Sequence, residues 1–339
     1  MQTLMLQADG QGIRRAAEII QKGGLVGIPT ETVYGLAGNA LDGSVSKKIF
    51  AAKGRPSDNP LIVHIGKTEE AAPLVAEFPA AAQKLAAAYW PGPLTMVLPK
   101  SGLVPMETSG GLSTVAVRLP SHPVANRLIQ ACGCPLAAPS GNLSGRPSPT
   151  TAQHMLHDMD GRIDAILDGG PCGVGVESTV LTLAEETPRL LRPGGVTLEM
   201  LQRVIGPVQV DPAVLHKLEE GAKAASPGMK YKHYAPKARV ILVKGSAQQY
   251  RGFVNGKKAP GVGALCCDED QAFLQVPCVP YGGENDSDSQ ARELFDALRA
   301  LDEQEEIDTV YARCPAPEGV GMAVYNRLIR AAGFEVISL

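Results

Sequence analysis

The amino-acid sequence predicts an α/β protein with a large domain, built on a twisted mixed sheet, and a smaller α/β domain after it. Short apolar segments typical of strands alternate with irregular helical segments over residues 1–205. Strand and helix patterns alternate more regularly over residues 239–339, which indicates a small parallel sheet. The Pro-rich residues 206–238 separate the two regions, and a chain of 339 residues usually divides into domains.

The large domain is expected to begin with a helix over residues 11–22, because its apolar residues fall on one stripe and Gly23 follows. Asp42 is expected to cap the second helix. Ser121 is expected to cap a later helix, with Pro123 in its first turn. The other helices are expected at residues 69–76 and 79–89, and the strands at residues 25–29, 61–65, 94–98, 114–120, 135–140, 164–169, 178–183 and 188–194.

Residues 206–238 are predicted to form an extended linker, because Pro207, Pro212 and the run SPGMKYKHYAP (226–236) interrupt any regular pattern. After it, alternating strands and helices are typical of a small Rossmann-like sheet. The strands are expected at residues 239–245, 262–267 and 307–313, and the helices at residues 288–301 and 322–332. The predicted units are therefore residues 1–205, 206–238 and 239–339.

The composition is that of a globular protein, with 44% apolar and 20% charged residues. With one Trp and 4% aromatic residues, extensive stacking of single-stranded nucleic acid is not favoured. No stretch approaches the roughly 20 apolar residues of a membrane span, and the N-terminus lacks the pattern of a secretory signal. The seven cysteines form no C-x-x-C pair, so we expect free thiols in a reducing cytoplasm.

The charge is unevenly distributed along the chain. Residues 1–205 carry 17 Lys and Arg against 17 Asp and Glu, whereas residues 206–238 carry 5 against 3. Residues 239–339 carry 10 Lys and Arg against 15 Asp and Glu. The acidic C-terminal region is therefore a poor candidate for binding RNA by itself.

The most informative segment is Lys53-Gly54-Arg55-Pro56, where two cations lie one residue apart in a bent stretch. Arg offers a planar fork and Lys a compact charge, so the pair can bind phosphate or carboxylate. If the chain is extended there, both side chains point to the same side. Most such pairs are solvated surface residues, so the interpretation depends on the motifs that follow.

Two predicted strands place polar groups opposite an apolar face. In the strand at residues 114–120, alternate Val and Leu form one face, and Thr114 and Arg118 lie with an alanine on the other. In the strand at residues 61–65, His64 lies opposite the apolar face. A solvent-exposed face usually carries Lys, Glu and Asp, so small residues beside single cations indicate the floor of a ligand site.

Other polar groups fall on turns. Residues 29–34, if extended, would place Thr32 and Tyr34 on one side and Glu31 on the other. The glycines of the turn at residues 138–149 allow the backbone to approach a ligand closely. The short hydrogen-bonding and cationic side chains near this turn and near the ends of later strands are Ser140, Asn142, Ser144, Ser148, Ser178 and Arg192.

Several common motifs are absent. The sequence has no G-x-x-x-x-G-K-[ST] P-loop, no G-x-G-x-x-G turn between a strand and a helix, and no nucleophile elbow. His154 and His157 lie three residues apart, but no further His or Cys cluster supports a metal site. The sequence therefore predicts no metal held by the protein itself.

Seven motifs, in this order and spacing, closely resemble one enzyme family: PTETVYGL (29–36), KGRPSDNPLIVHI (53–65), YWPGPLT (89–95), STVAVRLP (113–120), APSGNLSG (138–145), ESTV (177–180) and LRPG (191–194). That family is the threonylcarbamoyl-AMP synthases. Two further segments, SPGMKYKHYAP (226–236) and GVGMAVYNRLIRAAG (319–333), are similar to its longer, two-domain branch. The resemblance covers nearly the whole chain and is weakest at residues 245–305.

The resemblance implies a YrdC-like catalytic domain with a concave cationic cavity at residues 1–205, a linker and lid at 206–238, and a smaller Rossmann-like domain at 239–339. It implies a nucleotidyltransferase that makes threonylcarbamoyl-AMP and pyrophosphate from L-threonine, bicarbonate and ATP. The product would serve threonylcarbamoyladenosine modification of tRNA, through a tRNA threonylcarbamoyl transferase complex. Mg²⁺ is expected to arrive with ATP, and direct contact with tRNA is not required.

The resemblance also implies roles at matching positions. Lys53 and Arg55 are the expected catalytic residues, and Lys53 is expected to neutralise phosphate or bicarbonate. L-Threonine is expected to be held by Thr32, His64, Arg118, Ala138 through its backbone, and Ser178. ATP is expected to be held by Arg55, Asn59, Thr114, Ser140, Ser148, Arg192 and, as a lid, Tyr231. Tyr34 and Asn142 are expected to line the cavity.

Two other interpretations stay open at this point. A carbamoyl-transfer enzyme of related fold occurs within hydrogenase-maturation proteins, but these carry zinc-finger-like segments, and this sequence has no C-x-x-C pair. An RNA-binding module would use the concave basic face to hold double-stranded RNA. The equal numbers of acidic and basic residues in residues 1–205 argue against RNA binding as the main role.

Overall fold

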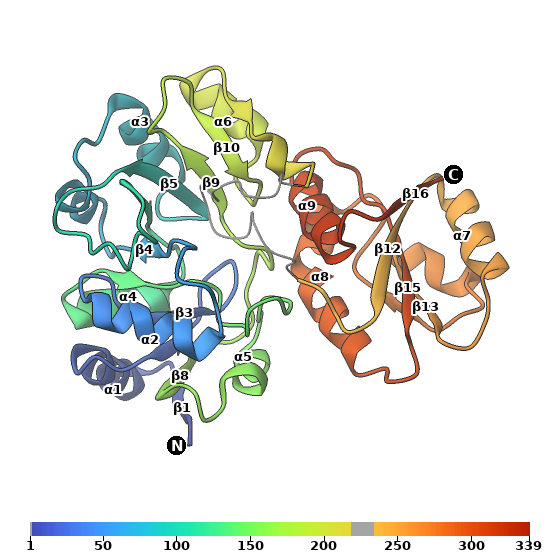
Figure 1. Ribbon diagram of the computed structural model, residues 1–339, viewed down its shortest axis with the longest axis horizontal. Coiled ribbons are helices and arrows are strands. Elements are labelled where there is room, and N and C mark those ends of the chain that lie inside the picture. The colour runs from blue at the N-terminus through green and yellow to red at the C-terminus, as the bar shows by residue number, and fades with distance from the viewer. Residues whose placement is uncertain (1, 218–233) are drawn as a thin grey trace.

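A computed structural model describes residues 2–217 and 234–339 of the chain. It contains an eleven-stranded mixed sheet and a five-stranded parallel sheet, each with its own helices, which lie side by side (Figure 1). The α/β fold class predicted from the sequence is confirmed. Within the described residues, no helix is both long enough and apolar enough to cross a membrane.

The helices of the large domain are α1 (Gly10–Gln21), α2 (Gly43–Lys53), α3 (Ala80–Tyr89), α4 (Pro123–Cys132), α5 (Ala152–Met159) and α6 (Leu198–Ile205), with short 3₁₀ helices at Thr68–Leu74 and Pro212–Val214. Its strands are β1 (Leu4–Gln7), β2 (Val26–Ile28), β3 (Gly35–Asn39), β4 (Ile62–His64), β5 (Leu94–Pro99), β6 (Thr114–Arg118), β7 (Leu136–Ala137), β8 (Ala165–Asp168), β9 (Thr179–Thr182), β10 (Arg189–Arg192) and β11 (Gln209–Val210). The order across the sheet is β1-β8-β2-β3-β7-β4-β6-β5-β9-β10-β11.

Helix capping explains where several of these helices begin. The Asp42 carboxylate accepts from the backbone N–H of Ser44, so the predicted start of α2 is confirmed. The prediction that Ser121 caps α4 is wrong. His122 takes that place, with its Nδ1 accepting from the Val124 backbone N–H.

The predicted alternation along β4 and β6 is confirmed. Val63, Val115 and Val117 lie in the main apolar core with residues of α2 and α3. Ile62 and Ala116 lie in a separate apolar cluster on the other face. The two strands pair in parallel, with His64 beside Arg118, so their polar side chains reach one edge of that second face.

The segment predicted as an extended linker begins differently in the structure. Gln209 and Val210 form β11, which pairs in parallel with β10 and extends the large sheet. The 3₁₀ helix at Pro212–Val214 follows, capped by Asp211. The sequence signal failed here because a two-residue edge strand has no periodicity to detect.

The C-terminal domain holds five parallel strands in the order β14-β13-β15-β12-β16. They are β12 (Arg239–Lys244), β13 (Val262–Cys266), β14 (Cys278–Pro280), β15 (Thr309–Arg313) and β16 (Val336–Ser338). Its helices are α7 (Ala247–Gly256), α8 (Ser287–Asp302) and α9 (Gly321–Ala331), with a 3₁₀ helix at Asp268–Phe273. The small parallel sheet predicted from the sequence is confirmed.

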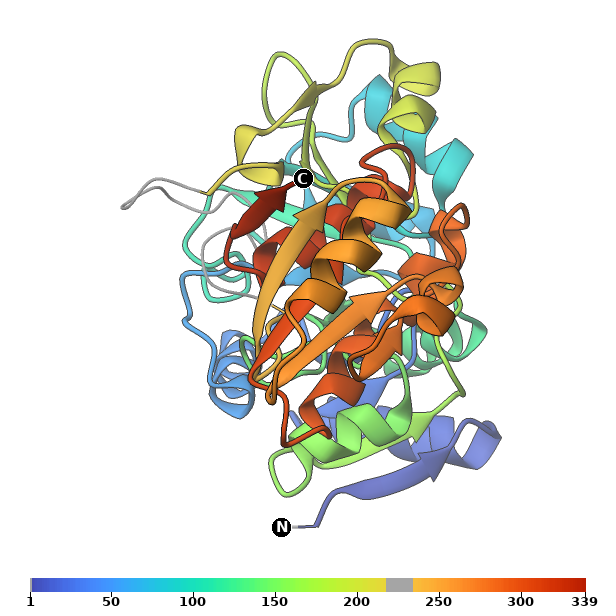
Figure 2. The ribbon, with the colours of Figure 1, turned by 90° about the vertical axis from the view of Figure 1, so that its right-hand side faces the viewer.

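The two faces of the small sheet are used differently. Helices α8 and α9 lie between the sheet and the large domain, whereas α7 covers the outer face (Figure 1). Seen from that outer side, α7 lies in front of the strands (Figure 2). The layer formed by α8 and α9 is therefore the one that contacts the large domain.

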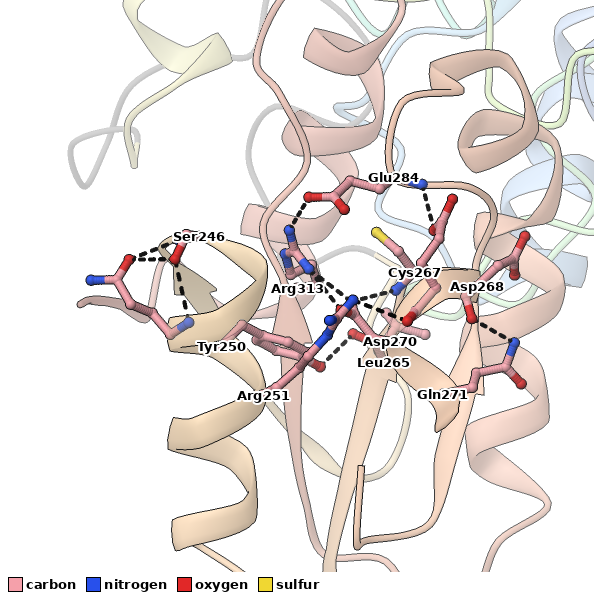
Figure 3. A network of polar contacts seen from close by, with 12 residues as sticks. Ser246, Tyr250, Arg251, Leu265, Cys267, Asp268, Asp270, Gln271, Glu284 and Arg313 are labelled. Atoms are coloured by element: carbon pink, nitrogen blue, oxygen red, sulfur yellow. Dashed lines mark hydrogen bonds and ion pairs between the residues drawn. The ribbon is translucent and has the colours of Figure 1, made fainter. Parts of the chain in front are cut away.

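A buried network of ion pairs joins helix α7 and the end of β15 to the segments that follow β13 and β14 (Figure 3). Asp270 is completely buried and pairs with Arg251 Nε at 2.7 Å and Arg313 Nη1 at 2.8 Å. Arg313 Nη2 also pairs with Glu284. A buried carboxylate with two arginine partners stabilises the fold only while the partners are intact.

Replacing Asp270 by Asn is therefore expected to lower the free energy of unfolding of this domain by about 3 kcal/mol, because two arginines lose their counter-charge. Urea unfolding monitored by circular dichroism measures the loss. The neighbouring Asp268 is exposed, and Asp268→Asn is expected to change the free energy by less than about 0.5 kcal/mol. Equal effects of the two substitutions would contradict the role given to the network.

Candidate functional site

One cavity of the large domain holds most of the predicted site residues. It encloses about 680 Å³ of empty space, counting the space at its mouth that is open to solvent. Its lining consists of Thr30, Thr32, Val33, Gly35, Lys53, Arg55, Ile62, His64, Arg118, Ala138, Pro139, Ser140, Asn142, Ser144, Glu177, Ser178, Arg192 and Tyr234. The four cations singled out in the sequence therefore face one hollow.

Two of these cations lie at or just after the C-terminal end of α2. Lys53 is the last residue of the helix, and Gly54 follows in the left-handed conformation with φ 60°, which glycine adopts without steric cost. The stretch is thus a helix end and not the extended segment considered from the sequence. Arg55 nevertheless reaches the same cavity, because the glycine turns the chain toward it.

Lys53 is held by backbone carbonyls and not by an acid. Its Nζ donates to Ser140 O and, at 2.6 Å, to Asn142 O. Burial, followed by the nearby charge of Arg55, lowers the pKa of its amine well below the ordinary value. A bound anion would reverse this effect, since it would favour the charged amine.

The charged form of Arg55 is also disfavoured by its surroundings. Its Nη2 donates to Asn59 O at 3.2 Å and to Pro60 O at 3.1 Å. Burial and the charge of Arg192 lower its pKa to about 10. Its Nε has no hydrogen-bond partner among the described residues. Repelling, incompletely paired cations in one cavity indicate an anionic ligand.

Arg118 comes from the end of β6 and is only 3% exposed. Its Nη1 donates to Thr32 Oγ1 at 2.9 Å, and its Nε donates to Gly92 O at 3.3 Å. Its Nη2 lies 2.7 Å from Glu31 Oε1. The guanidinium is therefore fixed in orientation at the wall of the cavity.

The sequence interpretation missed the part played by Glu31. Burial disfavours its charged form, but Arg118 outweighs this and holds the pKa of the carboxyl below its ordinary value. The motif PTETVYGL contains this residue, but the sequence predicts only that it points away from Thr32 and Tyr34, not that it pairs with Arg118. Glu31 lies in an irregular segment before β3, so no periodic signal connects it with Arg118, which is 87 positions away.

His64 lies beside Arg118 at the end of β4. Its Nδ1 lies 3.2 Å from Ile62 O. Burial, followed by the charge of Arg118, lowers its pKa to about 3, with Glu31 opposing the shift. The imidazole is therefore neutral at physiological pH and acts as a hydrogen-bonding group, not as a charge.

This predicts a pH dependence of stability. In the unfolded chain, a histidine binds a proton below about pH 6.5, whereas folded His64 stays neutral down to about pH 3. Stability is therefore lost as pH falls, by about 1.4 kcal/mol per pH unit from this group. Urea unfolding at several pH values should show that slope reduced in His64→Gln. Replacing the exposed His216 by Gln is the control, and an equal reduction there would contradict the assignment.

Residues 29–34 do not form the extended segment expected from the sequence. The Thr30 hydroxyl donates to Val33 O at 2.6 Å and accepts from the backbone N–H groups of Thr32 and Val33. This turn sends Thr30 and Thr32 into the cavity but rotates Tyr34 away from it. Tyr34 is wholly buried, and its hydroxyl donates to Gly170 O at 2.8 Å. The expectation that Tyr34 lines the cavity is therefore wrong.

Two further lining residues are Ser178, directly before β9, and Arg192, the last residue of β10. Arg192 Nε donates to Ser178 O at 3.0 Å, and its Nη2 donates to Ser178 Oγ at 3.2 Å. The Ser178 hydroxyl also lies 2.8 Å from Thr95 Oγ1. Glu177, which the sequence interpretation did not single out, lines the cavity next to them and accepts from the Ser148 hydroxyl.

Not every predicted residue reaches the lining. Ser148 is buried behind Glu177, Asn59 supports Arg55 through its backbone carbonyl, and Thr114 lies at the start of β6. Tyr231 is outside the described residues. Tyr234, from the same basic run, lies on the cavity wall and packs on Phe295 with ring centroids 5.3 Å apart.

The described part of the chain gives the cavity no ready-made metal cage. Within residues 2–217 and 234–339, no group of three His, Cys, Asp or Glu side chains is arranged to hold a metal ion. His154 and His157 lie on α5, outside the lining. The acid on the lining, Glu177, is already engaged by two partners. A divalent cation would have to bring most of its oxygen ligands with it.

Comparison with known protein families gives two matches. A family model for Sua5, YciO and YrdC proteins, described as telomere recombination, matches residues 18–194. A model described as the C-terminal domain of threonylcarbamoyl-AMP synthase matches residues 196–333. Together the two models cover both domains.

Curated relatives match over nearly the whole chain. The threonylcarbamoyl-AMP synthase of Pyrococcus abyssi is 48% identical over 336 residues, covering 96% of this chain and 96% of that protein. The threonylcarbamoyl-AMP synthase of Bacillus subtilis is 45% identical over 336 residues, covering 98% of this chain and 96% of that protein.

Solved structures agree with this. The crystal structure of P. abyssi Sua5 complexed with L-threonine has a TM-score of 0.91 and 44% sequence identity, and the match covers 100% of both chains. The crystal structure of E. coli YciO has a TM-score of 0.52 and 25% identity, covering 57% of this chain and 95% of that one. The long relatives therefore share both domains, and YciO shares one.

Proposed function

This chain belongs to the threonylcarbamoyl-AMP synthase family, and we infer that it makes threonylcarbamoyl-AMP in the cavity lined by Lys53, Arg55, Arg118 and Arg192. Its activity is that of a nucleotidyltransferase in tRNA modification, with L-threonine and ATP as substrates. We propose bicarbonate as the third reactant, with pyrophosphate and water as the other products.

The observation that carries this proposal is the gathering of four cations around one hollow. ATP, bicarbonate and the threonine carboxylate are all anions, and they repel one another in solution. A cavity that brings them together must offset that repulsion with fixed positive charge and oriented donors. The domain as a whole carries 17 Lys and Arg against 17 Asp and Glu, so this concentration of positive charge is local.

We place L-threonine at the end of the cavity formed by β4 and β6. Arg118 is the partner proposed for the threonine carboxylate, because a guanidinium pairs with a carboxylate through two parallel hydrogen bonds. Thr32, neutral His64, Ser178 and the backbone of Ala138 lie on the same lining and can position the amine and hydroxyl of the substrate.

We place the nucleotide at the other end, near Arg55, Ser140 and Arg192, which all lie on the lining. Asn59 and Ser148 support this end from behind, and Thr114 lies on the same strand as Arg118. Tyr234 is the described linker residue that lines the cavity, and Tyr231, proposed from the sequence as a lid, is outside the described residues.

The chemistry needs no nucleophile from the protein. The threonine amine attacks the carbon of bicarbonate, water leaves, and a carbamate forms. An oxygen of that carbamate then attacks the α-phosphorus of ATP, and the bond to pyrophosphate breaks. Lys53 is suited to stabilise the charge of the phosphate or of bicarbonate. We expect Mg²⁺ to enter on the ATP phosphates, since no group of three or more His, Cys, Asp or Glu side chains among the described residues is arranged to hold it.

The two competing interpretations lack a supporting observation. A carbamoyl-transfer enzyme of the hydrogenase-maturation type would need segments that this sequence does not contain. An RNA-binding module would present its cations on an open face, whereas Lys53, Arg118 and Arg192 are each at most 7% exposed. We propose that the product passes to a tRNA threonylcarbamoyl transferase complex, because a mixed anhydride hydrolyses if it is not used.

The direct test is synthesis by the full-length protein. Incubation with MgATP, bicarbonate and labelled threonine, with pyrophosphatase present, is expected to give one labelled acyl-adenylate and two phosphates for each ATP consumed, because pyrophosphatase hydrolyses the pyrophosphate that is released. Omitting bicarbonate should abolish the product. Release of pyrophosphate without a threonine-dependent adenylate would contradict the proposed reaction.

A further inference from the structure

One wholly buried arginine of the C-terminal domain contacts the large domain. Arg327, on α9, is 0% exposed. Its Nε lies 3.0 Å from Glu177 Oε2, and its Nη2 donates to Glu177 O at 3.2 Å. Its Nη1 donates to Pro193 O at 2.7 Å. All three nitrogens of the guanidinium therefore contact the other domain.

These contacts fall on the two segments that form one wall of the cavity. Glu177 lines the cavity and immediately precedes Ser178, and Pro193 immediately follows Arg192. Arg192 in turn donates to Ser178 O and Ser178 Oγ. Arg327 thus holds both segments from behind, at the point where their side chains enter the site.

The contact extends to a third segment. The second carboxylate oxygen of Glu177 accepts from the Ser148 hydroxyl, and Ser148 is completely buried. Ser148 belongs to the turn at residues 138–149, whose Ser140 and Asn142 also line the cavity. One arginine of the small domain is therefore linked, through one carboxylate, to the loops on both sides of the nucleotide end.

The charge of Glu177 makes this arrangement important for binding. Glu177 is a buried acid on the wall of a cavity that must accept anions. Burial disfavours its charged form, but Arg327 and then Arg192 outweigh that effect and keep the pKa of the carboxyl below its ordinary value. Glu177 thus forms an ion pair with Arg327, which does not line the cavity, and its charge is further stabilised by that of Arg192, which does.

We propose that Arg327 is a positioning residue for synthesis: by pairing with Glu177, it leaves Arg192 available for the phosphates of the nucleotide. Without Arg327, Glu177 would draw Arg192 toward itself and would repel the nucleotide. The inference rests on the proposed function, and it gives the C-terminal domain a defined task in building the nucleotide end of the site.

The test uses the full-length chain and two separate calorimetric titrations, one with MgATP and one with L-threonine. Arg327→Met is expected to weaken MgATP binding by about tenfold or more, since a buried carboxylate is left beside the phosphates. The loss of threonine affinity should be at least threefold smaller than the loss of MgATP affinity, because Arg118, the partner proposed for the threonine carboxylate, is untouched, although Ser178 directly follows Glu177. Arg327→Lys keeps the charge and should fall between Arg327→Met and the wild type.

The double variant Arg327→Met/Glu177→Gln separates charge from simple domain docking. Gln can still accept from Ser148 but carries no charge, so MgATP affinity should return to within about threefold of Glu177→Gln alone. A double variant that binds MgATP about tenfold more weakly than Glu177→Gln alone would overturn the proposal. This comparison holds even if Arg327→Met alone does not fold.

Asp296→Ala is the matched interface control. Asp296, on α8, contacts Thr150 and His154 of the large domain, but none of the three lines the cavity. MgATP binding by this variant should equal that of the wild type, and a loss as large as in Arg327→Met would overturn the proposal. A wild-type chain that binds neither ligand would instead contradict the proposed function itself.

Discussion

Arg118→Lys is expected to weaken L-threonine binding by about 10- to 100-fold while MgATP binding stays unchanged. A charge-assisted, two-point contact with a carboxylate contributes about 1.5–3 kcal/mol, and lysine cannot make it in that geometry. The contacts of Arg118 with Thr32 and Gly92 O hold the guanidinium plane in place. Isothermal titration with each ligand measures the two affinities.

Lysine is the informative substitution because of Glu31. That carboxylate lies 2.7 Å from Arg118 Nη2 and is largely buried, so Arg118→Ala would leave an unpaired buried charge and cost about 3 kcal/mol of stability as well. Arg189→Lys is the matched control. Arg189 lies on β10 and pairs with Glu185 and Asp211 away from the cavity. Loss of both ligands in Arg118→Lys would contradict the assignment of Arg118 to threonine.

Lys53→Met is expected to lower kcat/KM for ATP by about 100-fold or more. Oriented charges in a water-poor site typically contribute two to three powers of ten to a rate. The substitution removes a buried cation from the hollow and leaves Ser140 O and Asn142 O without the donor they now share. Pyrophosphate release at saturating threonine, measured over a range of MgATP concentrations, gives the value.

Lys48→Met provides the control on the same helix. Lys48 is exposed and donates to Gly23 O at 2.7 Å, outside the cavity. Its replacement should leave kcat/KM unchanged. Thermal unfolding of Lys53→Met should show a folded protein whose stability is lower by about 1–3 kcal/mol. A folded Lys53→Met protein with activity within about threefold of wild type would exclude a catalytic role for this lysine.

The parts of the fold that could be predicted from the sequence are those in which apolar and polar residues repeat regularly or a capping residue marks a helix end. Strands β4 and β6 alternate apolar and polar residues, so both the core face and the site face could be assigned, and His64 and Arg118 were found this way. The start of helix α2 was predicted from its cap, Asp42. Features with no period were missed. Strand β11 has two residues, and α7 was missed although Ser246 and Gln249 form a capping box.

The site shows the same division. Residues within one motif, such as Lys53 and Arg55, could be grouped from the sequence because few residues separate them. Contacts between distant segments could not. Glu177 and Arg327 are 150 positions apart, and the sequence places one at a strand end and the other on an apolar helix. Tyr34 was misplaced because the Thr30 hydroxyl closes a turn where an extended strand had been assumed.

The claim on which the rest depends is that four cations gather three anionic reactants in one hollow. A crystal structure of the protein with an unreactive MgATP analogue and L-threonine tests it most directly. We expect the phosphates within hydrogen-bond distance of Lys53, Arg55 and Arg192, and the threonine carboxylate against Arg118. Phosphates bound outside this cavity, or a threonine carboxylate that makes no contact with Arg118, would contradict the account.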